Sequence, residues 1–550
     1  MSWNQEYPRP TLRRNSFLCL NGAWQVNEQT VQVPYPPQSD LSCWNGAVPE
    51  ELRYQRSFIL PEGFCKKEDR VILHFGAVDQ IADVFVNGKH AAHHEGGYLP
   101  FSMDVTDILV PGENDLTVHV VDALDPVYPR GKQSTKPGGM WYTPVSGIWQ
   151  TVWMEAVPSA HAIRDIRITP DTKGFTIEVG ADAEKVKLTV DEQAFVFASC
   201  KPYRVDIACP RLWSTEDPWL YELVIETDKD RVESYTALRT IEMRTVEGKG
   251  RIFLNDSPVF LNGVLDQGYF ADGLFLPENP DDYDADVLRM KELGFNMLRK
   301  HIKIEPERFY HACDRLGMLV MQDMVSSGGY NFLLDTALPT IGLTRRPDRI
   351  PGQRRRKEFF RQHSLDTVAH LYNHPCIVAY TIFNEGWGQF DADGMYRLLK
   401  AADPTRIWDA TSGWFTQHES DMDSVHVYFR NKVLKGGKRP LLLSECGGYA
   451  REIEGHLFKS DAKYGYGDTD TETALTDRIA QLYAEMVLPS IPKGLCCVVY
   501  TQVSDVEEEI NGLYTYDRQV CKVDKARMKQ ILDEAEATLQ RELEGKLKGQ

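Results

Sequence analysis

The chain has 550 residues, too many for one ordinary domain, and its 42% of hydrophobic residues is enough for several cores. Its formal net charge of −18 disfavours nucleic acid and anionic membranes as partners, because both are negatively charged. The first residues, "MSWNQEYPRPTLRRNSF", lack the apolar segment of a secretory signal, and no stretch has the roughly 18 apolar residues of a membrane span, so we expect a cytoplasmic protein.

Two β domains are predicted first along the chain. Residues 1–157 hold short runs rich in Val, Ile, Phe and Trp, and Asn87-Gly88 separates two of them in the manner of a hairpin turn. This spacing favours a β-sandwich of the jelly-roll kind. Residues 158–243 stay β-like but are more charged, which suggests a small immunoglobulin-like β-sandwich.

The pattern changes to alternating strands and helices in residues 244–550. Eight strand-like apolar runs can be counted, from "SPVFLNGVLDQ" to "LCCVVYTQ", and helical segments separate most of them. This alternation predicts a C-terminal (β/α)8 TIM barrel. The segment between "RIWDATS" and "SVHVYF" is too short for a good helix.

The first two helices of this region have clear ends in the sequence. Asn279 is the expected N-cap of the first, with Pro280 at its first helical position and Gly294 at its end. The second is expected to open at Pro306 and to end at Gly317.

Active sites of such barrels lie at the carboxyl ends of the strands, so acidic residues that end an apolar run are the first candidates. Six carboxylates meet this condition: Asp266, Asp323, Glu385, Asp409, Glu445 and Asp505. A ring of carboxylates is suited to a positively charged, oxocarbenium-like transition state, which predicts the hydrolysis of a glycosidic bond.

Glu385 and Glu445 are the two candidates for the catalytic pair. Glu385 ends the fourth strand in "IFNEGWGQF", and Glu445 ends the seventh in "LLLSECGG". In a retaining glycosidase one carboxyl group protonates the leaving oxygen and the other attacks the anomeric carbon. Asn384 would then bind the sugar 2-hydroxyl, and Trp387 would form an apolar wall.

Further strand-end residues are expected to contact the substrate. Arg299 and His301 follow the second strand, and His426 and Tyr428 lie at the sixth. Trp414 could stack on a sugar face, whereas a core position would suit the indole equally well. The acids Asp266, Asp323 and Asp505 could contact the sugar or hold a neighbouring cation, and Asp409 is expected to be structural.

Together these motifs resemble glycoside hydrolase family 2, which contains β-galactosidases, β-glucuronidases and β-mannosidases. "GGYLPFSMDVTDIL" and "GGMWYTPVSGIWQTVWME" look like its sugar-binding jelly roll, and "LGFNMLRKH", "IFNEGWGQFD", "SECGG" and "NGLYTYDR" look like its barrel. The resemblance implies that Glu385 is the acid/base and Glu445 the nucleophile. It also implies that a loop of the first domain reaches the barrel, which would bring Lys132 and Gln133 to the pocket.

The chain departs from the β-glucuronidases of the family at one motif. Those enzymes hold the sugar carboxylate with Asn-x-Lys, whereas "VEEEINGLYTYDR" has Asn511 followed by Gly512 and Leu513 and no lysine. The favoured function is therefore a β-galactosidase-like exo-acting retaining β-glycosidase. The open alternatives are β-galacturonidase, α-L-arabinopyranosidase, β-mannosidase, with less support β-glucuronidase, and, from another class, a non-catalytic carbohydrate-binding protein.

Carbohydrate is the expected partner, a homo-oligomer stays open, and neither a cofactor nor a metal is expected. The eleven cysteines are scattered without a C-x-x-C pair, and Cys496 and Cys497 suit small core positions. The Arg-rich stretch 345–363 is interpreted as a solvated helix start, or as a cover for the leaving-group side of the pocket.

Overall fold

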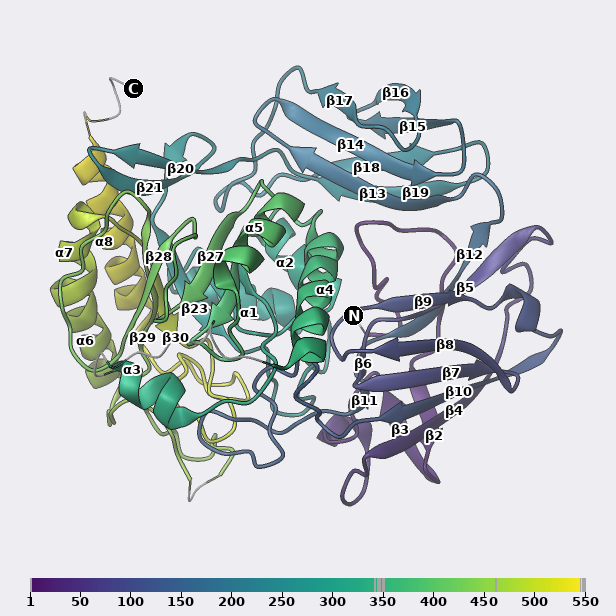
Figure 1. Cartoon of the computed structure of the whole chain (residues 1–550), viewed down its shortest axis with the longest axis horizontal. Helices are drawn as coiled ribbons and strands as arrows, with labels where there is room; N and C mark the ends of the chain where they lie inside the picture. The colour runs from purple at the N-terminus through teal and green to yellow at the C-terminus, as the bar shows by residue number, and fades with distance from the viewer. Residues whose placement is uncertain are drawn as a thin grey trace.

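The computed structural model describes residues 2–340, 343, 348, 352–459, 462–544 and 546. Three lobes are visible, with the helix-covered barrel beside an N-terminal β lobe and a second β lobe above the junction (Figure 1). Residues 345–347 and 349–351 of the Arg-rich stretch lie outside the described residues.

The N-terminal lobe is an antiparallel β-sandwich. Its larger sheet has six strands in the order β3 (Gln29–Val33), β2 (Gly22–Val26), β4 (Glu51–Ile59), β10 (Glu113–Val121), β7 (Ile81–Val86) and β8 (Lys89–Glu95). The second sheet has the order β1 (Leu18–Cys19), β12 (Val152–Pro158), β5 (Asp69–Phe75) and β9 (Phe101–Asp104), and β6 (Val78–Asp79) pairs with β11 (Gly147–Ile148). Two short 3-10 turns lie outside the sheets, η1 (Asp40–Ser42) and η2 (Thr106–Ile108).

The predicted hairpin at Asn87-Gly88 is confirmed. Val86 pairs with Lys89 across the turn, and both turn residues have left-handed backbones, with φ of 52° and 74°. This is the conformation for which Asn-Gly is selected in two-residue hairpins.

The second lobe is a seven-stranded antiparallel sandwich, as expected for an immunoglobulin-like domain. One sheet joins β13 (Ile163–Pro170), β14 (Gly174–Ala181) and β17 (Tyr203–Asp206). The other joins β16 (Gln193–Ala198), β15 (Lys185–Val190), β18 (Tyr221–Glu226) and β19 (Arg231–Thr236). Alternate residues of its strands, such as Val186, Leu188 and Val190, are buried between the sheets.

A small sheet then covers the amino end of the barrel. It is made of β20 (Ile241–Val246), β21 (Lys249–Leu254) and β22 (Ser257–Pro258). The buried Arg251 donates hydrogen bonds to the carbonyls of Ile491 and Leu495, just before and at the start of the last barrel strand. The first strand, β20, spans residues 243 and 244, the predicted junction between the second and third domains.

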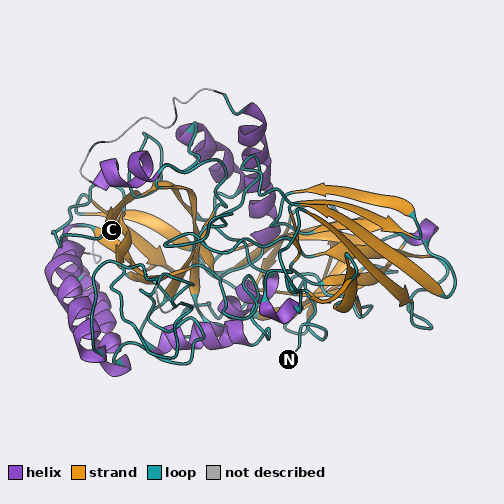
Figure 2. Cartoon of the chain, turned by 90° about the horizontal axis from the view of Figure 1, so that it is seen from below, coloured by secondary structure: helices purple, strands orange, loops and turns teal. Residues whose placement is uncertain are grey.

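Eight parallel strands form the barrel, as predicted. In chain order they are β23 (Leu261–Asp266), β24 (Met297–Lys300), β25 (Leu319–Asp323), β26 (Ile377–Asn384), β27 (Ile407–Ser412), β28 (Asp423–Val427), β29 (Leu441–Gly447) and β30 (Leu495–Thr501). Strands that are neighbours in the chain pair in parallel, and β23 pairs with β30, whereas β27 and β28, whose residues are all described, form the two unpaired ends of the sheet order. The strands are buried along almost their whole length, because helices surround them (Figure 2).

The surrounding helices are α1 (Asp282–Glu292), α2 (Glu307–Leu316), α3 (Leu338–Thr340), α4 (Arg354–Leu371), α5 (Ala392–Ala402), α6 (Glu472–Leu482), α7 (Leu488–Ser490) and α8 (Lys525–Leu543). Two π-helical turns precede α3 and α7, namely η3 (Leu333–Ala337) and η5 (Tyr483–Val487), and a 3-10 turn, η6 (Ile491–Lys493), follows α7. None of the described helices is long and apolar enough to cross a membrane.

Helix ends were predicted unequally well. The second helix follows Pro306 and ends at Gly317, whose φ of 72° suits a glycine C-cap. The first helix starts later than predicted, with Asp281 and not Asn279 at its N-cap, because the two residues after Asn279 form a preceding turn closed by Asp282 N–H to the Asn279 carbonyl. Residues 428–440, all described, also form no helix, which adds a second helix-free connection to the predicted one.

Candidate active site

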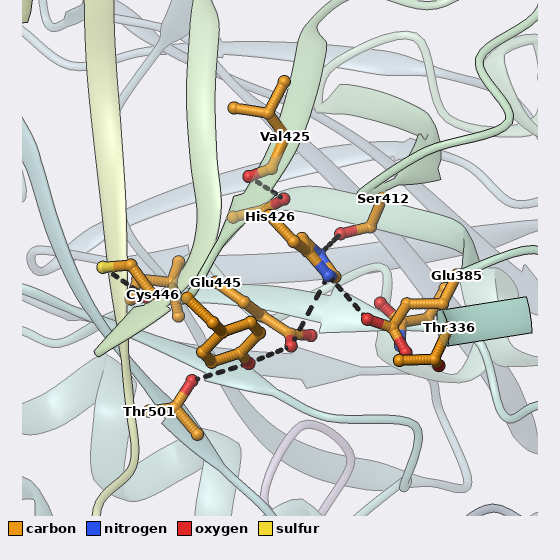
Figure 3. A network of polar contacts seen from close by, with 12 residues as sticks. Thr336, Glu385, Ser412, Val425, His426, Glu445, Cys446 and Thr501 are labelled. Atoms are coloured by element: carbon orange, nitrogen blue, oxygen red, sulfur yellow. Dashed lines mark hydrogen bonds and ion pairs between the residues drawn. The ribbon is translucent and has the colours of Figure 1, made fainter. Parts of the chain in front are cut away.

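The carboxyl ends of β26, β28 and β29 bring the predicted catalytic residues together. An oxygen of Glu385, an oxygen of Glu445 and a ring nitrogen of His426 all lie within 4.8 Å of one another (Figure 3). They line a cavity of about 810 Å³ together with Asn384, His301 and Tyr428. With Trp414, six of the predicted catalytic and binding residues therefore share one cavity with Glu445.

The backbone around Glu385 explains the glycines of the "NEGWG" motif. Glu385 has a left-handed backbone, with φ of 52°, and its N–H donates to the Ser412 carbonyl at 3.0 Å. A Cβ on Gly386 would lie 2.3 Å from the Phe415 ring, and one on Gly388 would lie 2.2 Å from the Ser327 carbonyl oxygen. A strained conformation of a non-glycine residue costs on the order of 1–3 kcal/mol, so the surrounding structure must hold Glu385 in place.

Glu445 is buried and is held as an anion. Its carboxylate accepts hydrogen bonds from Arg299 Nη1 at 3.1 Å and from the Tyr428 hydroxyl at 2.5 Å. Burial alone would raise the pKa of Glu445, but the charges of His426 and Arg299 outweigh it and lower the pKa to about 2. A carboxylate that stays ionised at neutral pH is suited to nucleophilic attack.

Arg299 is fixed from three sides behind the cavity and is fully buried. It makes a bidentate ion pair with Asp323, at 3.0 and 2.9 Å, and it donates to the Asn384 side-chain oxygen at 3.0 Å. Asp323 also accepts a hydrogen bond from His301, at 2.9 Å. Burial alone would raise the pKa of Asp323, but the charge of Arg299 outweighs this effect and lowers the pKa below its ordinary value. Asp323 is therefore a fixed anion. Arg299 acts through the two cavity residues that it contacts, Glu445 and Asn384.

His426 lies between the two glutamates. Its Nδ1 is 2.9 Å from Glu385 and 3.6 Å from Glu445, and its Nε2 is 2.9 Å from the Ser412 hydroxyl. Among the described residues this Glu-His-Glu group is the one set spaced closely enough to hold a metal ion. Each of its three side chains already has a hydrogen-bond partner within the protein.

Of three further residues predicted to contact the substrate, one lines the cavity and two lie behind its lining. Trp414 lines the cavity, and its ring meets His426 edge-on at 5.4 Å. Trp387 packs behind Glu385, against Trp141 at 5.1 Å, and Asp266 is paired with Lys300 at 2.6 Å. Neither Trp387 nor Asp266 is part of the cavity lining.

The remaining strand-end acids also have protein partners or are fully enclosed. Asp505 is paired with Lys522 at 2.7 Å, and burial raises its pKa to about 6. Asp409 is 1% exposed, and burial raises its pKa to about 6 as well. Both lie below the cavity surface.

The loop 125–139 of the N-terminal domain reaches the barrel, held by the N–H groups of Arg130 and Gly131, which donate to the Ser326 carbonyl. Lys132 lines the cavity, and its ammonium group lies 5.6 Å from the centre of the Trp141 ring. Gln133 is fully buried and instead binds Asp79 and the Tyr98 hydroxyl.

Glu509 and Gln267 also line the cavity, and sequence reasoning did not single them out. Glu509 is 4% exposed and accepts hydrogen bonds from the Tyr142 hydroxyl and from Asn511 Nδ2. Asn511 in turn accepts from Gln502, whose own side chain accepts from Gln267. The run of acids in "VEEEING" was the available signal, although only the fold shows which acid faces the cavity.

The described part of the Arg-rich stretch supports the site from outside. Arg356 of α4 donates to the Gly388 carbonyl at 2.9 Å and to the Ser327 hydroxyl at 3.2 Å. Arg355 donates to the Tyr128 hydroxyl at 2.6 Å. These two arginines therefore join α4 to the turn after Glu385 and to the N-terminal domain.

Two family models match the chain. They are described as "Glycosyl hydrolases family 2, sugar binding domain", over residues 9–158, and "Glycosyl hydrolases family 2, TIM barrel domain", over residues 246–437. Together they cover the first lobe and the barrel strands up to β28.

Curated relatives and solved structures agree with these models. A protein named beta-galactosidase from Aeromonas hydrophila is 28% identical over 68% of this chain and 37% of its own length. A protein named beta-glucuronidase from Paenibacillus borealis is 26% identical over 73% of both chains. The solved structure of an uncultured Clostridium sp. beta-glucuronidase has a TM-score of 0.74 at 19% identity, covering 96% of this chain and 100% of that chain. The chain spans less than half the length of several curated relatives.

Proposed function

Because this chain belongs to glycoside hydrolase family 2, we propose that it is a retaining, exo-acting β-glycosidase, with Glu445 as the nucleophile and Glu385 as the acid/base. One observation carries the proposal. Two carboxylates from different strands face each other within 4.8 Å, and among the described residues only Glu445 of the two is held by an arginine. This asymmetry gives the two groups different roles.

The first step forms a bond between a Glu445 oxygen and the anomeric carbon. The bond from that carbon to the leaving oxygen breaks, and this oxygen takes the proton of Glu385. In the second step Glu385 removes a proton from water, the water oxygen attacks the anomeric carbon, and the Glu445 carboxylate is released. His426 contacts both glutamates, so its ring nitrogen can interact with whichever of them carries the negative charge at each step.

The short distance between the carboxylates supports retention. Carboxyl groups about 5–5.5 Å apart leave no room for a water between nucleophile and sugar, whereas inverting enzymes need about 6.5–9.5 Å. Here the nearest oxygens of Glu385 and Glu445 lie within 4.8 Å. Direct attack by Glu445 fits this space better than attack by an intervening water.

Asn384 is placed to bind the glycone. Its side-chain oxygen accepts from Arg299 Nη2 at 3.0 Å, which orients the amide and leaves its NH2 group for the cavity. An NH2 group can donate to a sugar 2-hydroxyl, and this contact strengthens as charge develops in the transition state.

Glu509 favours a neutral sugar over a uronic acid. A buried carboxylate accepts hydrogen bonds from sugar hydroxyls, but it repels a second carboxylate in the same cavity. Burial raises the pKa of Glu509, while the nearby charge of Lys132 and the hydrogen bonds from Tyr142 and Asn511 oppose this rise. A β-galactosidase-like activity is therefore the leading proposal, and the name of the Aeromonas relative agrees with it. β-Galacturonidase, α-L-arabinopyranosidase, β-mannosidase and β-glucuronidase are the alternatives.

The replacement Glu509→Gln should shift this preference toward uronic acids. Removing the negative charge should lower the ratio of kcat/KM for a β-galactoside to kcat/KM for a β-galacturonide by about tenfold, since a hydrogen bond to a charged group contributes about 1.5–3 kcal/mol. The readout is kcat/KM for the two 4-nitrophenyl glycosides. Glu508→Gln is the matched control, because Glu508 pairs with Lys459 outside the cavity lining. An unchanged ratio in the Glu509 variant would remove this residue from glycone selection.

A panel of 4-nitrophenyl glycosides tests the function directly. We expect the β-galactopyranoside to have the highest kcat/KM, and NMR in the first minutes should detect the β-anomer of the released sugar. If no glycoside of the panel is cleaved, while the protein still binds sugars, the alternative of a non-catalytic carbohydrate-binding protein replaces the proposal.

A further inference from the structure

Two large aromatic side chains of the catalytic cavity are exposed to solvent. Phe332 is 58% exposed and Phe429 is 69% exposed, and both line the same cavity as Glu385. Single exposed apolar residues are normal on protein surfaces, but apolar groups that gather at a pocket are typical of a binding site.

The chemistry places the leaving group on the side of Glu385, because this residue protonates the leaving oxygen. The turn η3 borders that side. Thr336 of η3 is drawn beside the Glu385 carboxylate in Figure 3, and its hydroxyl is hydrogen-bonded to the Tyr330 hydroxyl. Phe332, directly before η3, therefore stands where the leaving group must pass.

Trp414 fixes η3 against the catalytic residues. Its indole N–H donates to the Asp335 carbonyl at 2.8 Å, while its ring meets His426 edge-on. An aromatic wall thus continues from His426, through Trp414, toward Phe332. Because a hydrogen bond from Trp414 to η3 holds this wall, little of it has to be ordered when a ligand binds.

Phe429 belongs to a second aromatic run that begins at the nucleophile. Tyr428, which donates to Glu445, stacks on Tyr466 at 4.2 Å between ring centres, and Tyr466 meets Phe429 edge-on at 5.8 Å. This second run therefore starts at the nucleophile and ends at an exposed phenylalanine, whereas the first leads from His426 to Trp414, which is bonded to η3, and Phe332 directly precedes η3.

We propose that Phe332, Trp414 and Phe429 form a leaving-group subsite for a planar aromatic aglycone, so that the preferred substrates are aryl β-glycosides such as those of phenols. This inference rests on the proposed function. The η3 side of the subsite is mostly apolar, with Phe332, Ala337 and Pro339, and its hydroxyl Thr336 is engaged by Tyr330. Among the described residues of this side, a second sugar would find few partners for its hydroxyls, whereas an aromatic ring gains contact with the phenylalanines.

The test compares three leaving groups on one sugar. The probes are β-galactosyl fluoride, methyl β-galactoside and 4-methylumbelliferyl β-galactoside, or the same three on the sugar that the glycoside panel identifies. Fluoride is too small to reach Phe332 or Phe429, so its hydrolysis reports on the catalytic residues and the glycone alone.

Phe332→Ala and Phe429→Ala should each lower kcat/KM for the methylumbelliferyl glycoside by about tenfold, with hydrolysis of the fluoride changed by less than about twofold. Phe458→Ala is the matched control, because Phe458 is 43% exposed but lies outside the cavity lining. Its kcat/KM for all three probes should match that of the wild type.

Each contrary outcome has a separate meaning. If the wild type cleaves the fluoride but both variants keep full activity on the methylumbelliferyl glycoside, the subsite is refuted and the glycosidase function stands. An equal loss on all three probes would assign the phenylalanines to the stability of the site and refutes the subsite as well. If the wild type cleaves none of the probes, the proposed function fails, and the inference fails with it.

Discussion

Glu445→Gln should lower kcat by a factor of at least about 10³, because the variant can no longer form a bond to the anomeric carbon. Glutamine keeps the size of the side chain, and its one oxygen can still accept the hydrogen bond of Arg299, while its NH2 group would face the Tyr428 hydroxyl, which can accept from it. The loss should therefore be chemical and should not come from a collapsed site. The measurement is kcat on the best substrate of the glycoside panel, with removal of contaminating wild-type enzyme verified.

The fold of this variant should survive, since Arg299 keeps its bidentate pair with Asp323 and is not left as an unpaired buried charge. A circular dichroism spectrum and a melting temperature close to those of the wild type would show this. The control is Glu508→Gln, which makes the same change at a glutamate that pairs with Lys459 outside the cavity lining and should keep both the wild-type rate and the melting temperature. Turnover near the wild-type rate in Glu445→Gln would contradict the assignment of the nucleophile.

The shared position of Glu385 and Glu445 at one cavity could be predicted from the sequence because each glutamate directly follows or ends a continuous apolar run. Glu385 and Glu445 belong to β26 and β29 or their immediate ends, and parallel strands of a barrel present their carboxyl ends on one face. The same rule placed His426 and Tyr428 at the cavity. It needs only the order of the strands and no knowledge of side-chain partners.

Other residues could not be placed in this way, because their position depends on the partner they meet in space. Asp266 ends an apolar run, but Lys300 of the neighbouring strand holds it behind the cavity. The left-handed backbone at Glu385 and Gly386 turns the chain, so that Trp387 points back to Trp141 of the first domain. Cross-strand and interdomain contacts of this kind leave no periodic signal in the sequence.

Residues on irregular segments were the hardest to foresee. Glu509 and Phe332 lie outside the strands, and neither the acidic run around Glu509 nor the residues around Phe332 predict which side chain faces the cavity. Loops carry much of the specificity of a barrel enzyme, whereas its strands carry the chemistry. For this chain the reaction was therefore easier to predict than the sugar or the leaving group.

The second large effect is expected for Glu385→Ala, which removes the acid/base. Protonation of the leaving oxygen contributes about 10²–10⁴-fold, so hydrolysis of a methyl glycoside or a disaccharide should fall by that factor. A substrate with an acidic phenol needs little protonation, and its first step should be almost unaffected. The glycosyl-enzyme should then accumulate, because no base activates the water, and a burst of phenol should precede a slow steady state.

Azide distinguishes the roles of the two glutamates. In Glu385→Ala the anion can occupy the space of the lost carboxylate and attack the glycosyl-enzyme without deprotonation, which should restore turnover and give the β-glycosyl azide. In Glu445→Ala the azide occupies the side of the nucleophile and should give the α-glycosyl azide from the same β-glycoside. NMR of the isolated product identifies the anomer.

The two anomers must differ if the roles are correct. Oxygens of Glu385 and Glu445 lie within 4.8 Å of each other, but the two carboxylates act on opposite faces of the anomeric carbon. A β-azide from the Glu445 variant and an α-azide from the Glu385 variant would mean that Arg299 holds the acid/base, and that the nucleophile is the glutamate beside Thr336.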